Sequence, residues 1–320
     1  NGANTSGGNQ ITTVGFEPEM LWVKNRTTTE NHALVDVVRN DLGNILYPNL
    51  TNAEQGGSYF TGTSNGFNIN TNNLNASGTN NYVAWNWKAG GAAVANTNGT
   101  INSDVSVNNT LGFSIVKYTG SSPNQTVGHG LDATPEFIVV KNMDTSGNGW
   151  ATQSPFSGGA DYHMMLNSTQ AAQNNVDWIW NDVNPTSTVF SIGQNGITNT
   201  SGDNYISYCF TSKPGFSKVG SYTGTGAAGN NVVTGFEPAF IMGKSSTNTE
   251  DWFIIDNKRG STKYLKPNTS AAEATAGAGI NFLANGFQLT GGSFNNSGYT
   301  FIYLAFAADG STATPSLANS

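Results

Sequence analysis

The sequence predicts an all-β fold, in which three tandem antiparallel β-sandwich domains of jelly-roll-like form each carry one short helical turn. Composition is the first reason: only 10% of the 320 residues are charged, 11% are aromatic, and Gly, Asn, Ser and Thr dominate. Uncharged polar turns between aromatic strands are typical of all-β proteins. The second reason is that one pattern of turn and strand occurs three times. The third is that each repeat closes with a strongly apolar strand.

The repeated pattern is a turn of Gly, an acidic residue and Pro, followed by a short apolar run that ends in Lys. It runs from Gly15 to Lys24, from Gly130 to Lys141 and from Gly235 to Lys244. A proline turn that leads into β-forming residues predicts a buried strand. The period of about 100 residues is that of a domain, because solenoid repeats span only about 20–50 residues. We therefore expect repeats at 1–91, 112–214 and 215–310, a linker at 92–111, and a tail or linker at 311–320.

The segment 92–111 has a second interpretation. It is rich in Asn, Thr and Ser, but Ile101, Val105 and Val107 alternate weakly with polar residues. Such a segment is either a linker or a strand wrapped on a neighbouring repeat.

A second strand follows the first in each repeat, and a short motif of Asn-x-Ser/Thr comes after it. The motif begins at Asn49, Asn167 and Asn268. In the outer repeats it continues as Ser/Thr-x-x-Glu, ending at Glu54 and Glu273, which is the capping box of helix starts. We expect a helical turn there, and a weaker one in the middle repeat. The triplets also match glycosylation sequons, which arise by chance in so Asn-rich a chain, and we predict no modification.

Each repeat then offers an Asn-Gly pair between strand residues, beginning at Asn65, Asn195 and Asn285, which predicts a hairpin. The closing strands follow, at 82–87, 205–210 and 301–306. Period-two alternation puts large side chains on one face of each and a small residue on the other. We expect these strands to be central, their large faces to form three separate cores, and their small faces to be covered by another layer. The large residues are Val83, Trp85, Trp87, Ile206, Tyr208, Phe210, Ile302, Leu304 and Phe306, and the small ones are Asn86, Cys209 and Ala305.

Charge and residue usage exclude several classes of function. The net charge is −7 and no basic stripe is present, which argues against nucleic-acid binding. An acidic surface fits a secreted or particle-surface protein. Cys209 is the single cysteine, so we expect a buried side chain and no disulfide or cysteine-based metal site. No apolar stretch approaches the ~20 residues of a membrane helix, and no signal peptide is recognisable.

Catalytic patterns are absent from the sequence. The three histidines are far apart, and no nucleophile elbow, phosphate-binding loop or dinucleotide fingerprint occurs. Lys24, Lys141 and Lys244 end one strand and Asp36 and Asp256 end the next, so they form a possible acid–base pair. The second repeat has Ser154 in place of the Asp, which favours a strand-end ion pair or turn cap. We predict that the protein is not an enzyme and has no catalytic residues, metal or cofactor.

Binding residues are best sought in a segment unique to the middle repeat, from Asp177 to Pro185. Its Trp178 and Trp180 are the binding candidates, because exposed aromatics stack on sugars or anchor interfaces. Packing in a core or between repeats is the alternative that we favour.

Five segments carry a resemblance to a known family: Tyr82–Gly91, Gly112–Gly120, Val127–Gly130, Asn204–Phe210 and Gly215–Gly224. They resemble repeated domains of tail-fibre and other virion proteins of marine bacteriophages, a family of largely uncharacterised function. The resemblance covers nearly the whole chain and implies a role at the particle surface, with no catalytic or ligand residues. Asn86 departs from the pattern, since Cys is expected there by analogy with Cys209.

The resemblance leads us to expect a structural component of a bacteriophage virion appendage, a tail fibre or a capsid-attached fibre, located on the extracellular virion surface. Its expected partners are other virion proteins and a host surface glycan, without nucleic acid or membrane insertion. Further copies of itself, as a homotrimer, are expected on separate grounds: ordering a Gly- and Asn-rich chain costs entropy, and the small-residue strand faces suit close packing between layers. One alternative is a carbohydrate-binding or polysaccharide-degrading module. A cellular surface adhesin or filament subunit is another.

The first repeat lacks an opening strand. Repeats two and three open with Gly-Phe-Ser, a short strand and Tyr-Thr-Gly, whereas Asn1–Asn4 already aligns with the later loop at 225–230. We expect an open edge beside Met20–Lys24, to be filled by residues upstream of Asn1 or by a strand from a neighbouring subunit.

Overall fold

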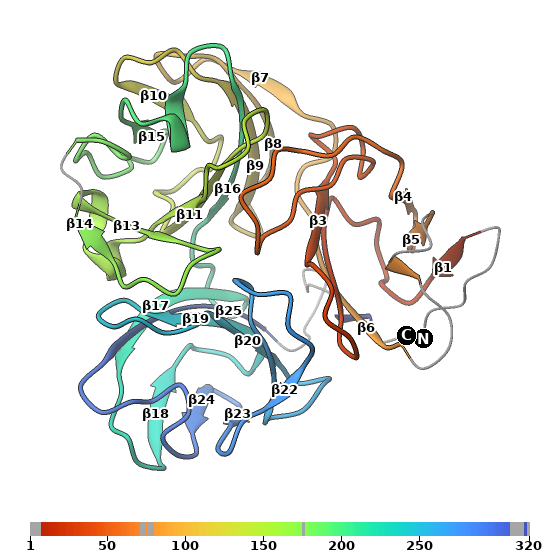
Figure 1. The fold of residues 1–320 in the computed structure, drawn as a ribbon, viewed down its shortest axis with the longest axis vertical. Helices are drawn as coiled ribbons and strands as arrows, with labels where there is room; N and C mark the ends of the chain where they lie inside the picture. Colours follow the sequence, from red (N-terminus) through yellow and green to blue (C-terminus); the bar gives the residue numbers. More distant parts are fainter. Residues whose placement is uncertain (1–7, 71–73, 76–79, 175–176, 308–316, 319–320) are drawn as a thin grey trace.

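The computed structural model describes residues 8–70, 74–75, 80–174, 177–307 and 317–318, and it confirms the all-β class. Every pairing of its named strands is antiparallel. Figure 1 shows three lobes around a common centre, one for each repeat. Asn1–Asn4 and residues 308–316, for which the sequence predicted a loop and a tail, lie outside the described residues.

The third repeat shows the full plan, a large sheet facing a small one. The large sheet has the order β17-β25-β19-β20-β21-β22, and the small sheet the order β18-β24-β23. The strands are β17 (Ser217–Thr223), β18 (Asn230–Val233), β19 (Pro238–Ser245), β20 (Phe253–Asp256), β21 (Lys263–Leu265), β22 (Ala274–Thr275), β23 (Ile280–Leu283), β24 (Gly286–Leu289) and β25 (Thr300–Ala307).

The first repeat has the same plan with fewer strands. Its large sheet is β26-β6-β2-β3 and its small sheet is β1-β5-β4. The strands are β1 (Asn9–Ile11), β2 (Met20–Asn25), β3 (Ala33–Asp36), β4 (Phe60–Thr63), β5 (Gly66–Ile69), β6 (Tyr82–Trp87) and the C-terminal β26 (Leu317–Ala318).

The second repeat has the widest sheet, in the order β14-β13-β12-β11-β16-β9-β8-β7, with β10-β15 as its small sheet. The segment 92–111 adds β7 and β8 to the edge of that sheet, so it is a strand wrapped on a neighbour and not a bare linker. The elements are β7 (Val94–Asn96), β8 (Ser103–Asn108), β9 (Phe113–Thr119), β10 (Gln125–Gly128), β11 (Phe137–Asn142), β12 (Trp150–Gln153), 3-10 turns Pro155–Ser157 and Gly159–Asp161, β13 (Tyr162–Met165), β14 (Gln173–Asn174), β15 (Val189–Ile192), α1 (Gly196–Asn199) and β16 (Asn204–Phe210).

The closing strands β6, β16 and β25 are central, as predicted, because each is paired on both sides. Their registers match: Trp22 pairs with Trp85, Val139 with Tyr208, and Met242 with Leu304. The three repeats can therefore be aligned residue by residue.

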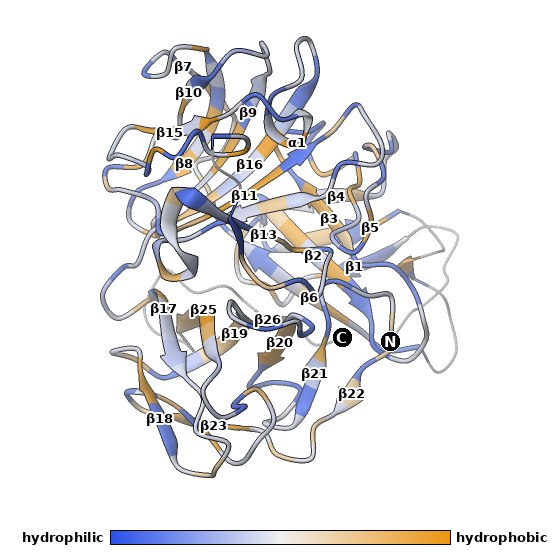
Figure 2. Ribbon diagram, turned by 60° about the vertical axis from the view of Figure 1, so that its left-hand side comes forward, coloured by the Kyte–Doolittle hydropathy of each residue, from blue (hydrophilic) through white to orange (hydrophobic). Residues whose placement is uncertain are grey.

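The prediction of three separate cores for the large faces is wrong. Buried residues from those faces of all three repeats form one central cluster. Phe306 is its best example, since its ring lies 5.9 Å from the rings of Trp87, Phe210 and Phe240 (centroid to centroid). The three large sheets thus stand around one shared core. In Figure 2 the orange, hydrophobic segments are concentrated on strands of the large sheets, such as β9, β11 and β16.

The small faces are covered as expected, and the covering layer is the small sheet of the same repeat. The predicted small residues Asn86, Cys209 and Ala305 are all fully buried. Cys209 and Ala305 belong to separate outer clusters together with residues of that sheet, and in the first repeat Ala84, two residues from Asn86 on the same face, does so. Each repeat therefore has its own outer core and shares the inner one. Since the small faces are already covered within the chain, they no longer supply a reason for packing between subunits.

The helical turns predicted at the capping boxes do not form. Residues 51–54 and 270–273 are irregular, and α1, in the second repeat, is the single α-helix of the described residues. It begins at the Asn195-Gly196 pair, where Asn195 Oδ1 accepts a bond of 2.9 Å from the Ile197 amide. The predicted hairpin is therefore wrong in that repeat. It is correct at Asn65 and Asn285, where β4 turns into β5 and β23 into β24.

The place of the missing first strand also differs from the prediction. In the other repeats the opening strand pairs with the closing strand, as β9 does with β16. The corresponding slot lies beside β6, not beside Met20–Lys24, because β2 already lies between β3 and β6. The chain's own β26 pairs there, Leu317 with Trp85 and Ala318 with Ala84. Two positions of the slot are thus taken by the C-terminal side of this chain. Filling of the rest by upstream residues or by a neighbouring subunit stays a prediction.

Candidate functional site

The three repeated lysines are fully buried at the ends of their strands. Each ammonium donates to the carbonyl of the next residue, at 2.7 Å for Lys24, 2.5 Å for Lys141 and 3.1 Å for Lys244. Burial lowers the pKa of each to about 8, because removal from water disfavours the charged form. Because these lysines are buried and bonded to backbone carbonyls, they stabilise the turns at the ends of their strands and are not accessible to a substrate.

The repeated aspartates pair with arginines and not with the lysines. Arg39 Nε lies 2.6 Å from Asp36 Oδ2, and Arg259 Nε lies 2.5 Å from Asp256 Oδ2, with all four side chains buried. The capping-box residue Glu54 accepts from Arg39 at 2.8 Å. Sequence reasoning missed these pairs, although an Arg follows each Asp by three residues.

The other capping-box residue, Glu273, joins the first and third repeats. It accepts bonds from Arg26 Nε at 2.8 Å and from Arg259 Nη1 at 3.1 Å. Hydrogen bonds from both arginines and their positive charges outweigh burial and lower the pKa of Glu273. The Glu273 carboxylate therefore links the first repeat to the third through these two arginines.

Residues at one aligned position join each repeat to the preceding one. His32 Nε2 lies 3.1 Å from the Lys266 carbonyl, Trp150 Nε1 donates to that of Tyr47 at 3.1 Å, and Trp252 Nε1 to that of Met165 at 3.0 Å. The first repeat thus binds the third, the second the first, and the third the second. The three contacts close a ring.

The Asn-x-Ser/Thr residues hold the same turns. Asn49, Asn167 and Asn268 each accept, through Oδ1, the backbone N–H of His32, Trp150 and Trp252 respectively, at 2.9–3.0 Å. Their recurrence is explained by this bond.

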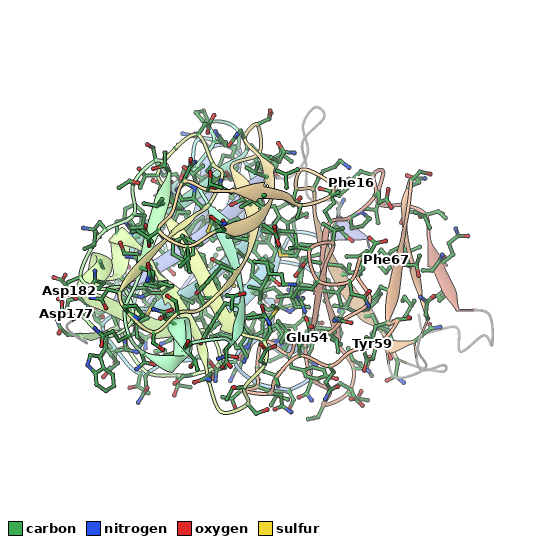
Figure 3. The ribbon with its side chains drawn as sticks, turned by 90° about the horizontal axis from the view of Figure 1, so that it is seen from above. Phe16, Glu54, Tyr59, Phe67, Asp177 and Asp182 are labelled. Carbon is green, nitrogen blue, oxygen red and sulfur yellow. The ribbon has the colours of Figure 1, made fainter. Side chains whose placement is uncertain are left out.

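The two tryptophans proposed as binding residues are separated by the fold. Trp180 is 1% exposed and belongs to the outer core of the second repeat, whereas Trp178 is 65% exposed. Their loop contains three residues with positive φ, Asp177, Asn181 and Asp182. Figure 3 shows Asp177 and Asp182 at the outer edge of the molecule, on the opposite side from Tyr59 and Phe67. The pair does not form one aromatic platform.

A polar cavity of about 310 Å³ lies in the third repeat, and sequence reasoning did not find it. The residues before β20, the strand β21 and the loop before β25 bring its walls together. It is lined by Glu250, Asp251, Trp252, Phe253, Tyr264, Lys266, Thr275, Ala276, Gly277, Ser293, Phe294, Asn296 and Phe301. A volume of this size lies at the lower end of small-molecule pockets, roughly 300–1,000 Å³.

The charged groups of the cavity are held in position by partners. Asp251 lies 2.6 Å from Lys266 Nζ and accepts from Asn268 Nδ2 at 2.7 Å. Burial acts to raise the pKa of Asp251, but the bonds from Lys266 and Asn268 outweigh it and lower the pKa. Glu250 accepts from Asn296 Nδ2 at 3.2 Å. The cavity therefore presents preoriented carboxylate, ammonium and amide groups.

An aromatic wall faces these groups, built around Phe294. Its ring lies 4.4 Å from that of Phe253 and 5.1 Å from that of Tyr264 (centroid to centroid). Phe294 has a φ of 57°, which is rare for a bulky residue. Tyr222 holds this backbone by donating to the Phe294 carbonyl at 2.6 Å.

The third repeat alone combines these residues. The aligned positions of Glu250 and Asp251 are Glu30 and Asn31 in the first repeat, and Asn148 and Gly149 in the second. The pairing of Leu34 with Leu46, equivalent to that of Ile254 with Leu265, places Ile45 where Tyr264 stands and Tyr47 where Lys266 stands. Two repeats form their sandwich without this charged set, so the fold does not require it.

Among the residues that the structure describes, no group of three or more His, Cys, Asp or Glu side chains could hold a metal ion. Within the same described residues, no helix has the length and apolar character needed to span a membrane.

These features define a class, an all-β protein of three repeats around a shared core with a polar cavity in one repeat. A comparison with protein families matches residues 1–309 to the family described as a domain of unknown function, DUF7483. The chain belongs to this family. No curated protein and no solved structure gave a significant match.

Proposed function

We propose that the protein is a non-catalytic structural component of a bacteriophage virion appendage, a tail fibre or a capsid-attached fibre. The observation that carries this proposal is the use of the recurring polar residues. Lysine, aspartate and asparagine recur in the repeats, and each is bonded inside the fold or between repeats. Because these recurring polar residues are used to bond the fold together, they favour a rigid structural protein.

Backbone bonds strengthen the same joints. The Glu54 amide donates to the Met143 carbonyl at 2.7 Å, the Ala172 amide to Ser246 at 2.8 Å and the Glu273 amide to Arg26 at 2.9 Å. Each joins one repeat to the next, in cyclic order. A ring closed by such bonds has few open segments for a protease, which suits a protein exposed outside the cell.

The proposed location on a virion is supported by the resemblance of the five segments to virion proteins, together with the acidic net charge. Further copies of the chain, other virion proteins and a host glycan stay as proposed partners. The homotrimer stays a prediction, to be tested by light scattering of the purified chain.

The experiment is to locate the protein on particles. Antibodies against the chain, used for immunogold labelling of purified particles, are expected to mark fibres, and mass spectrometry is expected to find the protein in them. Label confined to the surface of host cells would contradict the proposal and favour the adhesin alternative.

The polysaccharide-degrading alternative is less well supported. Hydrolysis needs two carboxyl groups free to act on the scissile bond, and Asp251 is already paired with Lys266 at 2.6 Å and bonded to Asn268 at 2.7 Å. The cavity therefore favours binding.

A further inference from the structure

We propose that the cavity of the third repeat binds a neutral saccharide unit. Glu250, Asp251, Lys266 and Asn296 contact its hydroxyl groups, and the rings of Tyr264 and Phe294 contact its apolar face. The site goes beyond the structural role, and it binds the sugar whether the chain stands on a particle or on a cell.

The polar groups match a ligand rich in hydroxyls. A hydroxyl both donates and accepts, and the cavity offers carboxylate acceptors, an ammonium donor and an amide that does both. The bonds of Asp251 to Lys266 and Asn268 fix these groups before the ligand arrives, which lowers the entropic cost of binding.

The charges favour a neutral ligand over an ion. Glu250 and Asp251 are balanced by Lys266 in the wall and by the buried Lys244 behind it, whose charge acts on both carboxylates. A phosphate would meet two carboxylates, and a metal cation would compete with the ammonium of Lys266, which lies 2.6 Å from Asp251. The remaining class is a polar, uncharged molecule.

The aromatic wall separates a sugar from other neutral polar molecules. A pyranose ring has a face of C–H groups, and amphipathic aromatic rings suit such a face. Phe294 and Tyr264 are only partly buried, so their rings are accessible from the cavity. The φ of 57° at Phe294 is a strained conformation for a bulky residue, and strain of this kind clusters at ligand sites.

The size of the cavity limits the ligand. About 310 Å³ suits one saccharide unit or the end of a chain, not a long polysaccharide segment. The first repeat has Ile45 in place of Tyr264 and Tyr47 in place of Lys266, and the second has Asn148 and Gly149 in place of Glu250 and Asp251. We therefore assign one such site to the three repeats.

The test measures binding of neutral methyl glycosides (glucose, galactose, mannose and N-acetylglucosamine) and their disaccharides to the full chain. Binding is detected by saturation-transfer NMR and quantified by calorimetry. At least one sugar is expected to bind. Asp251→Asn and Phe294→Gly are each expected to weaken binding at least tenfold. Glycine accepts the φ of position 294, so the second variant removes the ring without backbone strain.

Trp178→Ala is the matched control, because Trp178 is the most exposed aromatic of the binding candidates and lies in another repeat. It is expected to bind as the unaltered chain does. Melting curves check that each variant is folded. Absence of binding to every sugar of the panel overturns the proposal. So does unchanged binding in folded Asp251→Asn and Phe294→Gly, or loss of binding in Trp178→Ala, which moves the site to the second repeat.

Discussion

The indole nitrogen of Trp85, in the closing strand of the first repeat, donates a bond of 3.2 Å to the buried carboxylate of Asp256 in the third. The same relationship joins Tyr208 of the second repeat to Asp36 of the first, at 2.7 Å. At the third joint, the aligned residues are Ser154 in the second repeat and Leu304 in the third. At the joint between the second and third repeats, therefore, both the buried carboxylate and the side chain that donates to it are replaced, by Ser154 and Leu304.

The first prediction concerns the ion pair behind this carboxylate. Arg259→Ser is expected to destabilise the chain by about 3–5 kcal/mol, because it leaves Asp256 buried without its cation. The second repeat has Ser154 and Ser157 at these positions, so the double variant Asp256→Ser/Arg259→Ser is expected to lose less than the single one. Urea denaturation measures both. A double variant less stable than Arg259→Ser would show that the charges are not coupled.

The second prediction concerns acid. Burial lowers the pKa of His32 to about 3, against 6.5 in the unfolded chain. As the pH falls below 6.5, the unfolded state takes up a proton and the folded state does not, so stability is lost down to about pH 3. Trp22→Val/His32→Trp copies Val139 and Trp150 of the second repeat and removes this titration.

Urea denaturation at pH 7, 5 and 4 compares this double variant with the unaltered chain. The variant is expected to lose less stability over that range. An equal loss would assign the acid sensitivity to the carboxylates instead.

The third prediction concerns base. Burial lowers the pKa of Lys141 from 10.5 to about 8. Between these values the unfolded state holds the proton that the folded state has released, so stability from this group rises with pH. Lys141→Met removes that contribution. The free energy of unfolding, measured at pH 8 and pH 10, is expected to rise less in the variant, and an equal rise would contradict the assignment.

The fourth prediction concerns the shared core. Phe306→Ala is expected to destabilise the chain by about 3–5 kcal/mol, because the ring contacts rings from all three repeats. Since the core is common, the repeats should unfold together, and circular dichroism and tryptophan fluorescence should give one coincident transition. Separate transitions, of which the substitution shifts only one, would contradict the shared core and support three independent cores.

The sequence by itself determined the all-β class, the three repeats, the central closing strands and the side chains on each of their faces. Those features are local: period-two alternation and turn residues fix which residues face together, whatever lies opposite. It did not determine what covers each face, because Trp87, Phe210 and Phe306 meet only when three sheets surround one axis. Glu54 and Glu273 carried a local helix signal, but no helix forms there. Their carboxylates instead pair with the buried guanidinium groups of Arg39 and Arg259, which would otherwise lie buried with less negative charge beside them. The cavity was likewise decided by the fold alone, which brings Glu250, Lys266 and Phe294 together from three separate segments.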